Sequence, residues 1–171
     1  MARIALIGLP GSGKSTLGPP LGAALDSPFL DMDSLLEESS GWSPREWVES
    51  HGWETFRSAE SIVLAALDRS FNHDAEVVVG CGGGVVETAS NVEILENWKC
   101  VWLDAPDQVL LQRTEWSNRP QHPGENAESA LVRMRESRSP KYLGLGGEAV
   151  DTSQMSPEQG VVTILSLLGE L

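Results

Sequence analysis

The sequence predicts an α/β fold of three layers, in which helices cover both faces of a five-stranded parallel sheet. Short apolar runs alternate along the whole chain with longer segments that carry helix-capping residues or helical periodicity. This alternation is typical of parallel sheets, because each strand returns to the same end of the sheet through a helix. The 171 residues suffice for one hydrophobic core, so residues 1–171 are expected to form a single domain.

Five short segments are predicted to be strands because they are apolar and end at glycine or polar residues. The third of them is Glu-Val-Val-Val-Gly, a run typical of a strand that is buried on both faces. The strands are expected at residues 3–7, 28–31, 76–80, 100–104 and 149–152.

Helices are predicted where capping residues or apolar periodicity follow a strand. Capping boxes with proline in the first turn begin at Ser43 and at Ser156, and Thr88 is a candidate cap for a helix that ends near Trp98. Further helices are expected over 14–25, 54–70 and 128–138 and from 106, and the polar segment 115–127 is expected to be a mobile loop. The helix over 54–70 is expected to bury Phe56, Ala59, Ile62, Val63, Ala66 and Leu67.

Pro19 and Pro20 fall inside the helix expected over 14–25. A proline inside a helix removes one backbone hydrogen bond and clashes with the preceding turn, at a cost of roughly 3 kcal/mol. The helix is therefore expected to be kinked or to end early.

Residues 8–16, Gly-Leu-Pro-Gly-Ser-Gly-Lys-Ser-Thr, match the pattern G-x-x-x-x-G-K-[ST] between a predicted strand and a predicted helix. In this context the backbone N–H groups of the loop form a cradle for phosphate groups. Lys14 is expected to reach the β- and γ-phosphates of ATP, and the Ser15 hydroxyl to be a ligand of Mg²⁺. The alternative is a glycine-rich turn that binds nothing. The expected nucleotide-binding residues are Gly11, Ser12, Gly13, Lys14, Ser15 and Thr16.

Asp31 and Asp33 follow the second predicted strand, at the edge where open α/β sheets bind ligands. One carboxylate near Mg²⁺ and one facing a substrate hydroxyl would suit phosphoryl transfer. The alternative is that Asp33 only caps the helix that follows.

The three consecutive glycines 82–84 follow the third predicted strand, and they reach the same edge of the sheet. Such a run costs backbone entropy and indicates that the backbone closely approaches another group. That group belongs either to a ligand or to another loop.

Three arginines are candidates for binding anions. Arg57 has Glu60 three residues on, the spacing of an exposed ion pair on a helix. Arg119 lies in the polar segment 115–127, and Arg138 ends the helix that follows it. An arginine on a closing loop suits a γ-phosphate, because the guanidinium group binds oxyanions bidentately and keeps its charge. Taken singly, each of the three is better explained as a surface residue.

The composition argues against several classes of function. The net charge of −13 argues against a nucleic-acid partner, and no apolar run approaches the roughly 20 residues of a membrane span. Cys81 and Cys100 lack the spacing of a disulfide framework or a metal site, and the three histidines are scattered. The first strand leaves no room for a signal peptide, so a cytoplasmic protein is expected.

Taken together, these residues resemble the shikimate kinase family over essentially the whole chain. The phosphate loop is shared by many families, whereas the combination of Asp-x-Asp, Phe-Arg and Gly-Gly-Gly is much more specific. The Trp-Glu-x-Phe-Arg and Cys-Gly-Gly-Gly versions are similar to the kinase domain of the fungal multifunctional shikimate-pathway enzyme. The resemblance is carried by residues 8–16, 29–33, 52–57 with Glu60, 81–87, Arg113, Arg119-Pro120 and 138–142.

The resemblance implies a P-loop kinase fold that transfers the γ-phosphoryl group of ATP to the 3-hydroxyl of shikimate. Asp33 would hold ring hydroxyls and orient the attacking 3-hydroxyl. A further role of Asp33 would be to remove the proton of that hydroxyl. Arg57 and Arg138 would hold the shikimate carboxylate. The floor of the acceptor site would be formed by Gly82, Gly83 and Gly84.

On the nucleotide side, the resemblance implies that Arg119 descends with a lid over 115–127 onto the transferring phosphoryl group. Arg113 would lie against the adenine, and Asp31 would contact the hydration shell of Mg²⁺. The catalytic residues would be Lys14, Asp33 and Arg119. The expected partner is the small-molecule substrate alone, and the expected state is a monomer.

The chain departs from the family pattern at Pro19-Pro20, at Gln121-His122 after the lid Arg-Pro, and at 143–147, which lacks basic residues. None of these changes removes a proposed catalytic residue. One alternative is a kinase of another small hydroxy acid such as gluconate. Such an enzyme would not require Arg57 and Arg138 to converge with Asp33. The other alternative is a catalytically weak sensor derived from such a kinase, which the presence of Lys14 and Asp33 disfavours.

Overall fold

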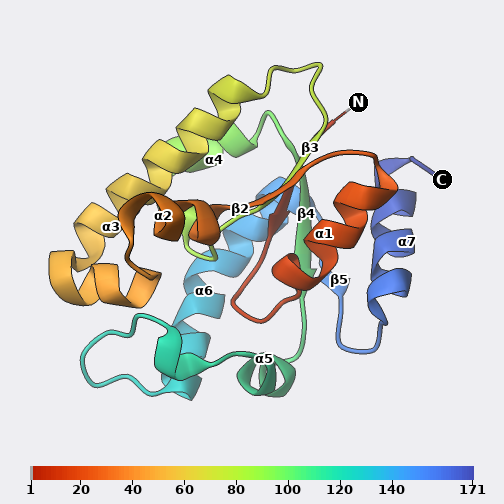
Figure 1. The fold of residues 1–171 in the computed structure, drawn as a ribbon. Helices are drawn as coiled ribbons and strands as arrows, with labels where there is room; N and C mark the ends of the chain where they lie inside the picture. The colour runs from red at the N-terminus through yellow and green to blue at the C-terminus, as the bar shows by residue number, and fades with distance from the viewer. Residues whose placement is uncertain (1) are drawn as a thin grey trace.

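The structure, a computed structural model, describes residues 2–171 and contains one five-stranded sheet with helices on both faces (Figure 1). The strand order is β2-β3-β1-β4-β5, and every neighbouring pair runs parallel. The predicted three-layer α/β fold is therefore confirmed. The strands are β1 (Arg3–Ile7), β2 (Phe29–Asp31), β3 (Val77–Gly80), β4 (Lys99–Asp104) and β5 (Val150–Asp151).

Helices connect the strands and form the two outer layers. Among residues 2–171, none of them combines the length and the apolar character needed to cross a bilayer. The helices are α1 (Lys14–Ala24), α2 (Met32–Ser40), α3 (Pro44–Ser70), α4 (Ala89–Leu95), α5 (Asp107–Arg113), α6 (Ala127–Gly146) and α7 (Pro157–Leu168), with short 3-10 helices η1 (Val85–Glu87) and η2 (Trp116–Asn118).

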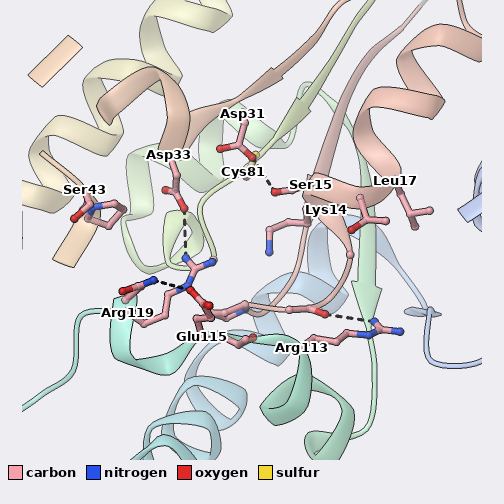
Figure 2. A pocket seen from close by; sticks show the side chains of 18 of the residues that line it. Lys14, Ser15, Leu17, Asp31, Asp33, Ser43, Cys81, Arg113, Glu115 and Arg119 are labelled. Carbon is pink, nitrogen blue, oxygen red and sulfur yellow. Dashed lines mark hydrogen bonds and ion pairs between the residues drawn. The ribbon is translucent and has the colours of Figure 1, made fainter. Parts of the chain in front are cut away.

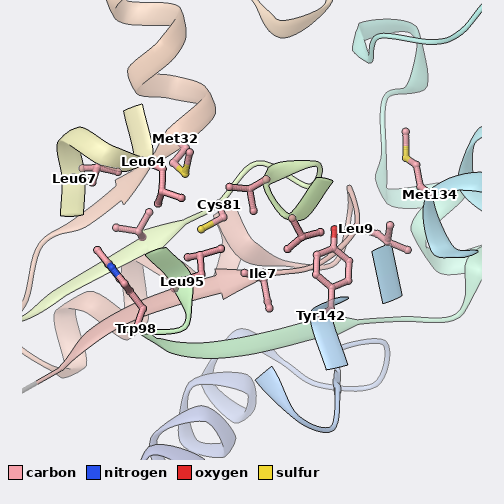
Figure 3. Packing of buried hydrophobic residues seen from close by; sticks show 14 of the residues in the cluster. Ile7, Leu9, Met32, Leu64, Leu67, Cys81, Leu95, Trp98, Met134 and Tyr142 are labelled. Carbon is pink, nitrogen blue, oxygen red and sulfur yellow. The ribbon is translucent and has the colours of Figure 1, made fainter. Parts of the chain in front are cut away.

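The pleat of the central strands divides the core into two clusters. Ile4 and Leu6 of β1 belong to the cluster that packs against α1 and α7, whereas Ala5 and Ile7 belong to the cluster on α3, α4 and α6 (Figure 3). Successive side chains of a strand point to opposite faces. A strand covered on both faces must therefore be apolar at every position, which is why these strands appear as uninterrupted apolar runs.

The register of the central strands brings the predicted functional segments together. Gly80 at the end of β3 lies opposite Leu6 of β1 and opposite Asp31 of β2. Because all three strands are parallel, the segments that follow them leave the sheet at the same edge. The phosphate loop, the Asp31–Asp33 turn and the glycine triplet 82–84 are consequently neighbours.

The helix α3 differs from its prediction in two ways. The two helices expected from 43 and over 54–70 form one element, with a kink at Gly52 (φ 84°, ψ 167°). Ile62 and Ala66, both predicted to be buried, are exposed, Ile62 to 68%, whereas Glu60 and Leu64 are buried. A charged residue was not expected on the buried face, and Glu60 can lie there because Arg57 pairs with it.

Prolines interrupt the helices less than predicted. The helix α1 continues through Pro19 and Pro20 to Ala24, so the expected early end is wrong. Both prolines are exposed, so the carbonyl groups that lose a partner can bond to water. The helix α6 extends past its predicted end at Arg138 and through Pro140, held by the buried side chain of Tyr142.

The helix α4 is shorter than predicted. It ends at Leu95 rather than near Trp98, and Thr88 occupies the N-cap position without a capping hydrogen bond from its side chain. The turn is instead fixed by the buried Asn91, whose amide donates to the Val85 carbonyl at 3.0 Å. This bond ties α4 to η1, directly after the glycine triplet.

Candidate active site

The phosphate loop connects β1 to α1, and its shape depends on Gly13. This residue is the N-cap of α1 with φ of 109°, a conformation that strains any residue with a side chain. No side chain among the described residues caps this end of α1. The backbone N–H groups of the first turn, at Lys14, Ser15 and Thr16, are therefore open to an anion.

Lys14 lies over the loop from which it starts. Its Nζ donates to the carbonyl groups of Gly8 at 2.6 Å and Leu9 at 3.0 Å. Burial and, to a smaller extent, the positive charge of Arg119 together lower the pKa of Lys14 to about 8. A triphosphate in the loop would act in the opposite direction, because negative charge favours the ammonium form.

Ser15 and Asp31 form an oxygen-rich corner beside the loop. The Ser15 hydroxyl donates to Asp31 Oδ2 at 3.2 Å (Figure 2). A hydroxyl and a carboxylate fit Mg²⁺, which takes few protein ligands in nucleotide sites and keeps several waters. Asp31 Oδ1 also accepts a hydrogen bond from the Ser34 backbone at 3.0 Å, so Asp31 is the N-cap of α2. The alternative that Asp33 only caps this helix is therefore wrong.

Asp33, in the first turn of α2, faces Arg119 across the cleft, with Oδ2 and Nη1 3.6 Å apart (Figure 2). Removal from bulk water raises the pKa of Asp33, and the charge of Arg119 opposes this rise. A carboxylate with a raised pKa is well suited to accept a proton near neutral pH.

Arg119 is carried by the segment between α5 and α6, which corresponds to the predicted lid. Near its end, Glu125 accepts a hydrogen bond from the backbone N–H of His122 and pairs with Arg133 of α6. The His122 ring stacks on Trp53 of α3, with centroids 5.0 Å apart and planes at 12°. The segment thus rests on the helix that carries Arg57, and its role as a mobile lid stays a prediction.

The glycine triplet after β3 lies directly against charged side chains of the site. A Cβ atom would be too close to a neighbour at Gly82 and Gly84 and would fit only tightly at Gly83. The close approach expected from the sequence is therefore an approach to these side chains. A Cβ atom at Gly82 would lie 2.6 Å from Glu60 Oε2, one at Gly83 would lie 3.1 Å from Arg138 Nη1, and one at Gly84 would overlap the Arg57 guanidinium group.

Arg57 of α3 and Arg138 of α6 converge on Glu87. Glu87 Oε2 accepts from Arg57 Nη2 at 2.8 Å and from Arg138 Nη2 at 3.2 Å. Arg57 Nη1 also donates to Glu60 Oε1 at 2.9 Å. This i,i+3 pair is not the exposed one that the spacing allowed, because the Glu60 side chain is only 4% exposed. Burial raises the pKa of Glu60, and the charge of Arg57 opposes the rise.

Both arginines line a small cavity of about 50 Å³, together with Asp33, Arg119 and the glycine triplet. Arg138 Nε is buried and has no hydrogen-bond partner among the described residues. The small cavity adjoins a cleft of about 1210 Å³ that is lined by the phosphate loop. Asp33 and Arg119 line both spaces, so they lie between a basic pocket and the phosphate loop.

Arg113, at the end of α5, lies on the rim of the larger cleft. Its guanidinium group donates to Thr152 Oγ1 and to the Thr152 carbonyl, each at 2.9 Å. Thr152 Oγ1 in turn donates to the Ser12 carbonyl at 2.8 Å. Arg113 therefore braces the phosphate loop from outside, and its contact with an adenine ring stays a prediction.

The sequence indicated no role for Glu87, Thr152 or the ring of His122. Glu87 lies within the family-like segment 81–87, but it is 30 residues from Arg57 and 51 from Arg138. No local pattern indicates contacts over such separations. These contacts become visible only in the structure, where α3 and α6 bring Arg57 and Arg138 to Glu87 at the same edge of the sheet.

A parallel sheet with a phosphate loop after β1, and a carboxylate and an arginine facing that loop, defines the class of P-loop kinases. Within this class the shikimate kinase family model matches residues 10–169. The chain belongs to the shikimate kinase family.

Individual relatives agree with this assignment. The chain is 32% identical to the shikimate kinase of Enterococcus faecalis in an alignment of 173 positions, gaps included. This alignment covers 99% of this chain and 100% of that protein. It is 36% identical over 169 residues to the bifunctional shikimate kinase/3-dehydroquinate synthase of Thermotoga maritima, covering 98% of this chain but only 33% of that protein. The structure of shikimate kinase from Acinetobacter baumannii in complex with shikimate matches with a TM-score of 0.89 and 32% identity, covering 98% of this chain and 93% of that one.

Proposed function

We propose that this chain transfers the γ-phosphoryl group of ATP to the 3-hydroxyl of shikimate, giving shikimate 3-phosphate and ADP. The observation that carries the proposal is that Asp33, which faces the phosphate loop, shares one cavity with Arg57 and Arg138. A kinase for an acceptor without a carboxylate at this position would not need two arginines there.

The acceptor is held by charge at one end and by hydrogen bonds at the other. Arg57 and Arg138, which both line the small cavity, bind its carboxylate through their guanidinium groups. Asp33 accepts hydrogen bonds from ring hydroxyls and turns the 3-hydroxyl toward the phosphate loop. The glycine triplet lets the ring lie close to the backbone.

Transfer is direct, without a phosphoenzyme. The 3-hydroxyl oxygen forms a bond to the γ-phosphorus as the bond between that phosphorus and the ADP oxygen breaks, and the hydroxyl proton passes to the Asp33 carboxylate. Lys14 exchanges the Gly8 and Leu9 carbonyl groups for oxygens of the β- and γ-phosphates. Arg119 turns from Asp33 to the transferring group, where it stabilises the charge of the transition state.

The remaining residues hold the nucleotide. Ser15 and, through water, Asp31 would hold Mg²⁺, which neutralises charge on the β- and γ-phosphates when bound. The loop backbone binds the phosphates, and Arg113 lies beside the adenine. The lid excludes water, so ATP is not hydrolysed in place of acceptor transfer.

ADP release from ATP and Mg²⁺ tests this proposal when shikimate, gluconate and buffer alone are compared. We expect rapid release with shikimate only. An analogue in which the shikimate carboxylate is reduced to an alcohol should lose roughly 30- to 1000-fold in kcat/KM, the usual effect of removing one partner of a buried charge pair. Release with gluconate but not with shikimate would assign the chain to another hydroxy acid.

A further inference from the structure

Glu87, the last residue of η1, lies behind the two arginines that are proposed to bind the acceptor. Arg57 and Arg138 line the small cavity, whereas Glu87 is not one of its lining residues. The single oxygen Oε2 of Glu87 receives one hydrogen bond from each arginine, at 2.8 and 3.2 Å. The two guanidinium groups are therefore joined through one carboxylate atom on the side away from the cavity.

This arrangement offsets a strong repulsion. The side chain of Arg138 is 4% exposed and that of Arg57 is 20% exposed, so water screens their charges poorly. Partial burial would raise the pKa of Glu87, but the charges of Arg138 and Arg57 outweigh it and hold that pKa below its ordinary value. Glu87 is thus a carboxylate at neutral pH and supplies the negative charge between them.

Glu87 also decides which donors remain for a ligand. Among the described residues, Glu87 is the one carboxylate that pairs with Arg138. It occupies Nη2 and leaves Nη1 beside Gly83, which lines the cavity. Arg57 is held at two points, by Glu60 at Nη1 and by Glu87 at Nη2. Ser137 Oγ lies 3.4 Å from Glu87 Oε1 and helps to fix the carboxylate itself.

We propose that Glu87 is a positioning residue for acceptor binding, which holds Arg57 and Arg138 at the spacing that one carboxylate bridges. With this spacing set from behind, the substrate carboxylate can bridge the same two guanidinium groups from the front without reorganising them. The inference rests on the proposed function, because it assigns the carboxylate of the acceptor to this pair.

Steady-state kinetics of E87A and E87Q, with shikimate and ATP varied separately, test the inference. We expect E87A to raise the KM for shikimate by roughly 10- to 100-fold, the range for lost hydrogen bonds to a charged group. E87Q keeps an acceptor oxygen of the same reach, so its increase should be smaller. The KM for ATP should stay unchanged in both, because Glu87 contacts neither the phosphate loop nor Arg113.

Asp68→Asn is the matched control. Asp68 Oδ1 also accepts two hydrogen bonds, from Arg3 Nη1 at 2.7 Å and from Trp98 Nε1 at 2.9 Å, but it lies near the opposite edge of the sheet. D68N should lower the melting temperature and leave the KM for shikimate at its wild-type value. Comparing the melting temperatures of E87A and D68N then separates a loss of stability from a loss of positioning.

A double-mutant cycle with R138K tests whether Glu87 acts through Arg138. If it does, the effects of E87A and R138K on the KM for shikimate are far from additive. Unchanged KM values in both Glu87 variants, a fall in the KM for shikimate, or an equal rise of both KM values would overturn the inference. A wild-type protein without shikimate-dependent turnover would instead overturn the proposed function, and this inference with it.

Discussion

The Arg119 guanidinium group and the Asp33 carboxylate lie 3.6 Å apart, so the segment between α5 and α6 meets α2 in one ion pair. The charge of Arg119 opposes the rise that burial produces in the pKa of Asp33. In the proposed mechanism Arg119 turns to the phosphoryl group, so this opposition would weaken and Asp33 would become a stronger base. The same movement would bring positive charge to the phosphate and prepare the carboxylate to accept the proton.

Asp33→Asn should abolish most of the transfer. The amide keeps the size of the side chain but cannot accept the hydroxyl proton, so we expect kcat to fall by roughly 10²- to 10⁴-fold. ADP release with saturating shikimate measures this. Asp74→Asn, which changes an exposed carboxylate in the turn before β3, is the control and should match the wild type. A D33N protein with wild-type kcat would remove Asp33 from the proton transfer.

The plot of kcat/KM for ATP against pH should fall on both the acid and the alkaline side. Lys14 has a pKa of about 8 in the free protein because of its burial. The value of kcat/KM for ATP should therefore fall as pH rises through about 8 and Lys14 loses its charge. At the acid side it should fall as pH drops through the pKa of Asp33, which burial raises above its ordinary value. In K14R the alkaline limb should vanish from the remaining activity, because arginine keeps its charge. A limb that persists in K14R belongs to another group.

Gly84→Ala should damage acceptor binding more than nucleotide binding. The added methyl group would overlap the Arg57 guanidinium group and push it from its place beside Glu87. We expect a rise in the KM for shikimate of roughly tenfold or more, as for a lost charged hydrogen bond. Gly144→Ala in α6, where a Cβ atom would have no neighbour within 4 Å, is the control and should leave both KM values unchanged. Equal kinetics of the two variants would contradict the role of the triplet.

His122→Ala should loosen the lid. The stack of His122 on Trp53 is an aromatic pair, and such pairs contribute roughly 0.5–1.5 kcal/mol beyond their buried area. Its loss should raise ATP hydrolysis without acceptor relative to transfer by roughly two- to tenfold, since a lid that closes less well admits water. H122F keeps a flat ring and should restore the ratio. An unchanged ratio in H122A would show that the stack does not control closure.

The parts of the site that depend on local sequence could be predicted from it. The phosphate loop has a fixed pattern between a strand and a helix, and the apolar runs of β1, β3 and β4 reflect burial on both faces. The topology then places Asp31 beside Gly80 and so brings the second and third motifs to the loop. The sequence also showed the positions of Arg57 and Arg138, although only the resemblance suggested that they converge.

The parts that depend on long-range packing could not be predicted. Glu60 is buried because Arg57 pairs with it and Gly82 lies against it, whereas helical periodicity alone predicted that Ile62 is buried. The continuation of α6 past Pro140 depends on Tyr142, whose hydroxyl donates to the Gly83 carbonyl on another element. In both cases the deciding contact is with the glycine triplet, which is far from Glu60 and from Tyr142 in the chain.

Phosphorus NMR of the product formed from ATP and shikimate tests the central claim most directly. The proposed mechanism predicts ADP and a single phosphate monoester, whose phosphorus couples to the ring proton at carbon 3. Inorganic phosphate as the sole new signal besides ADP, or an ester at another hydroxyl, would contradict the assignment of Asp33 to the 3-hydroxyl and of the arginine pair to the carboxylate.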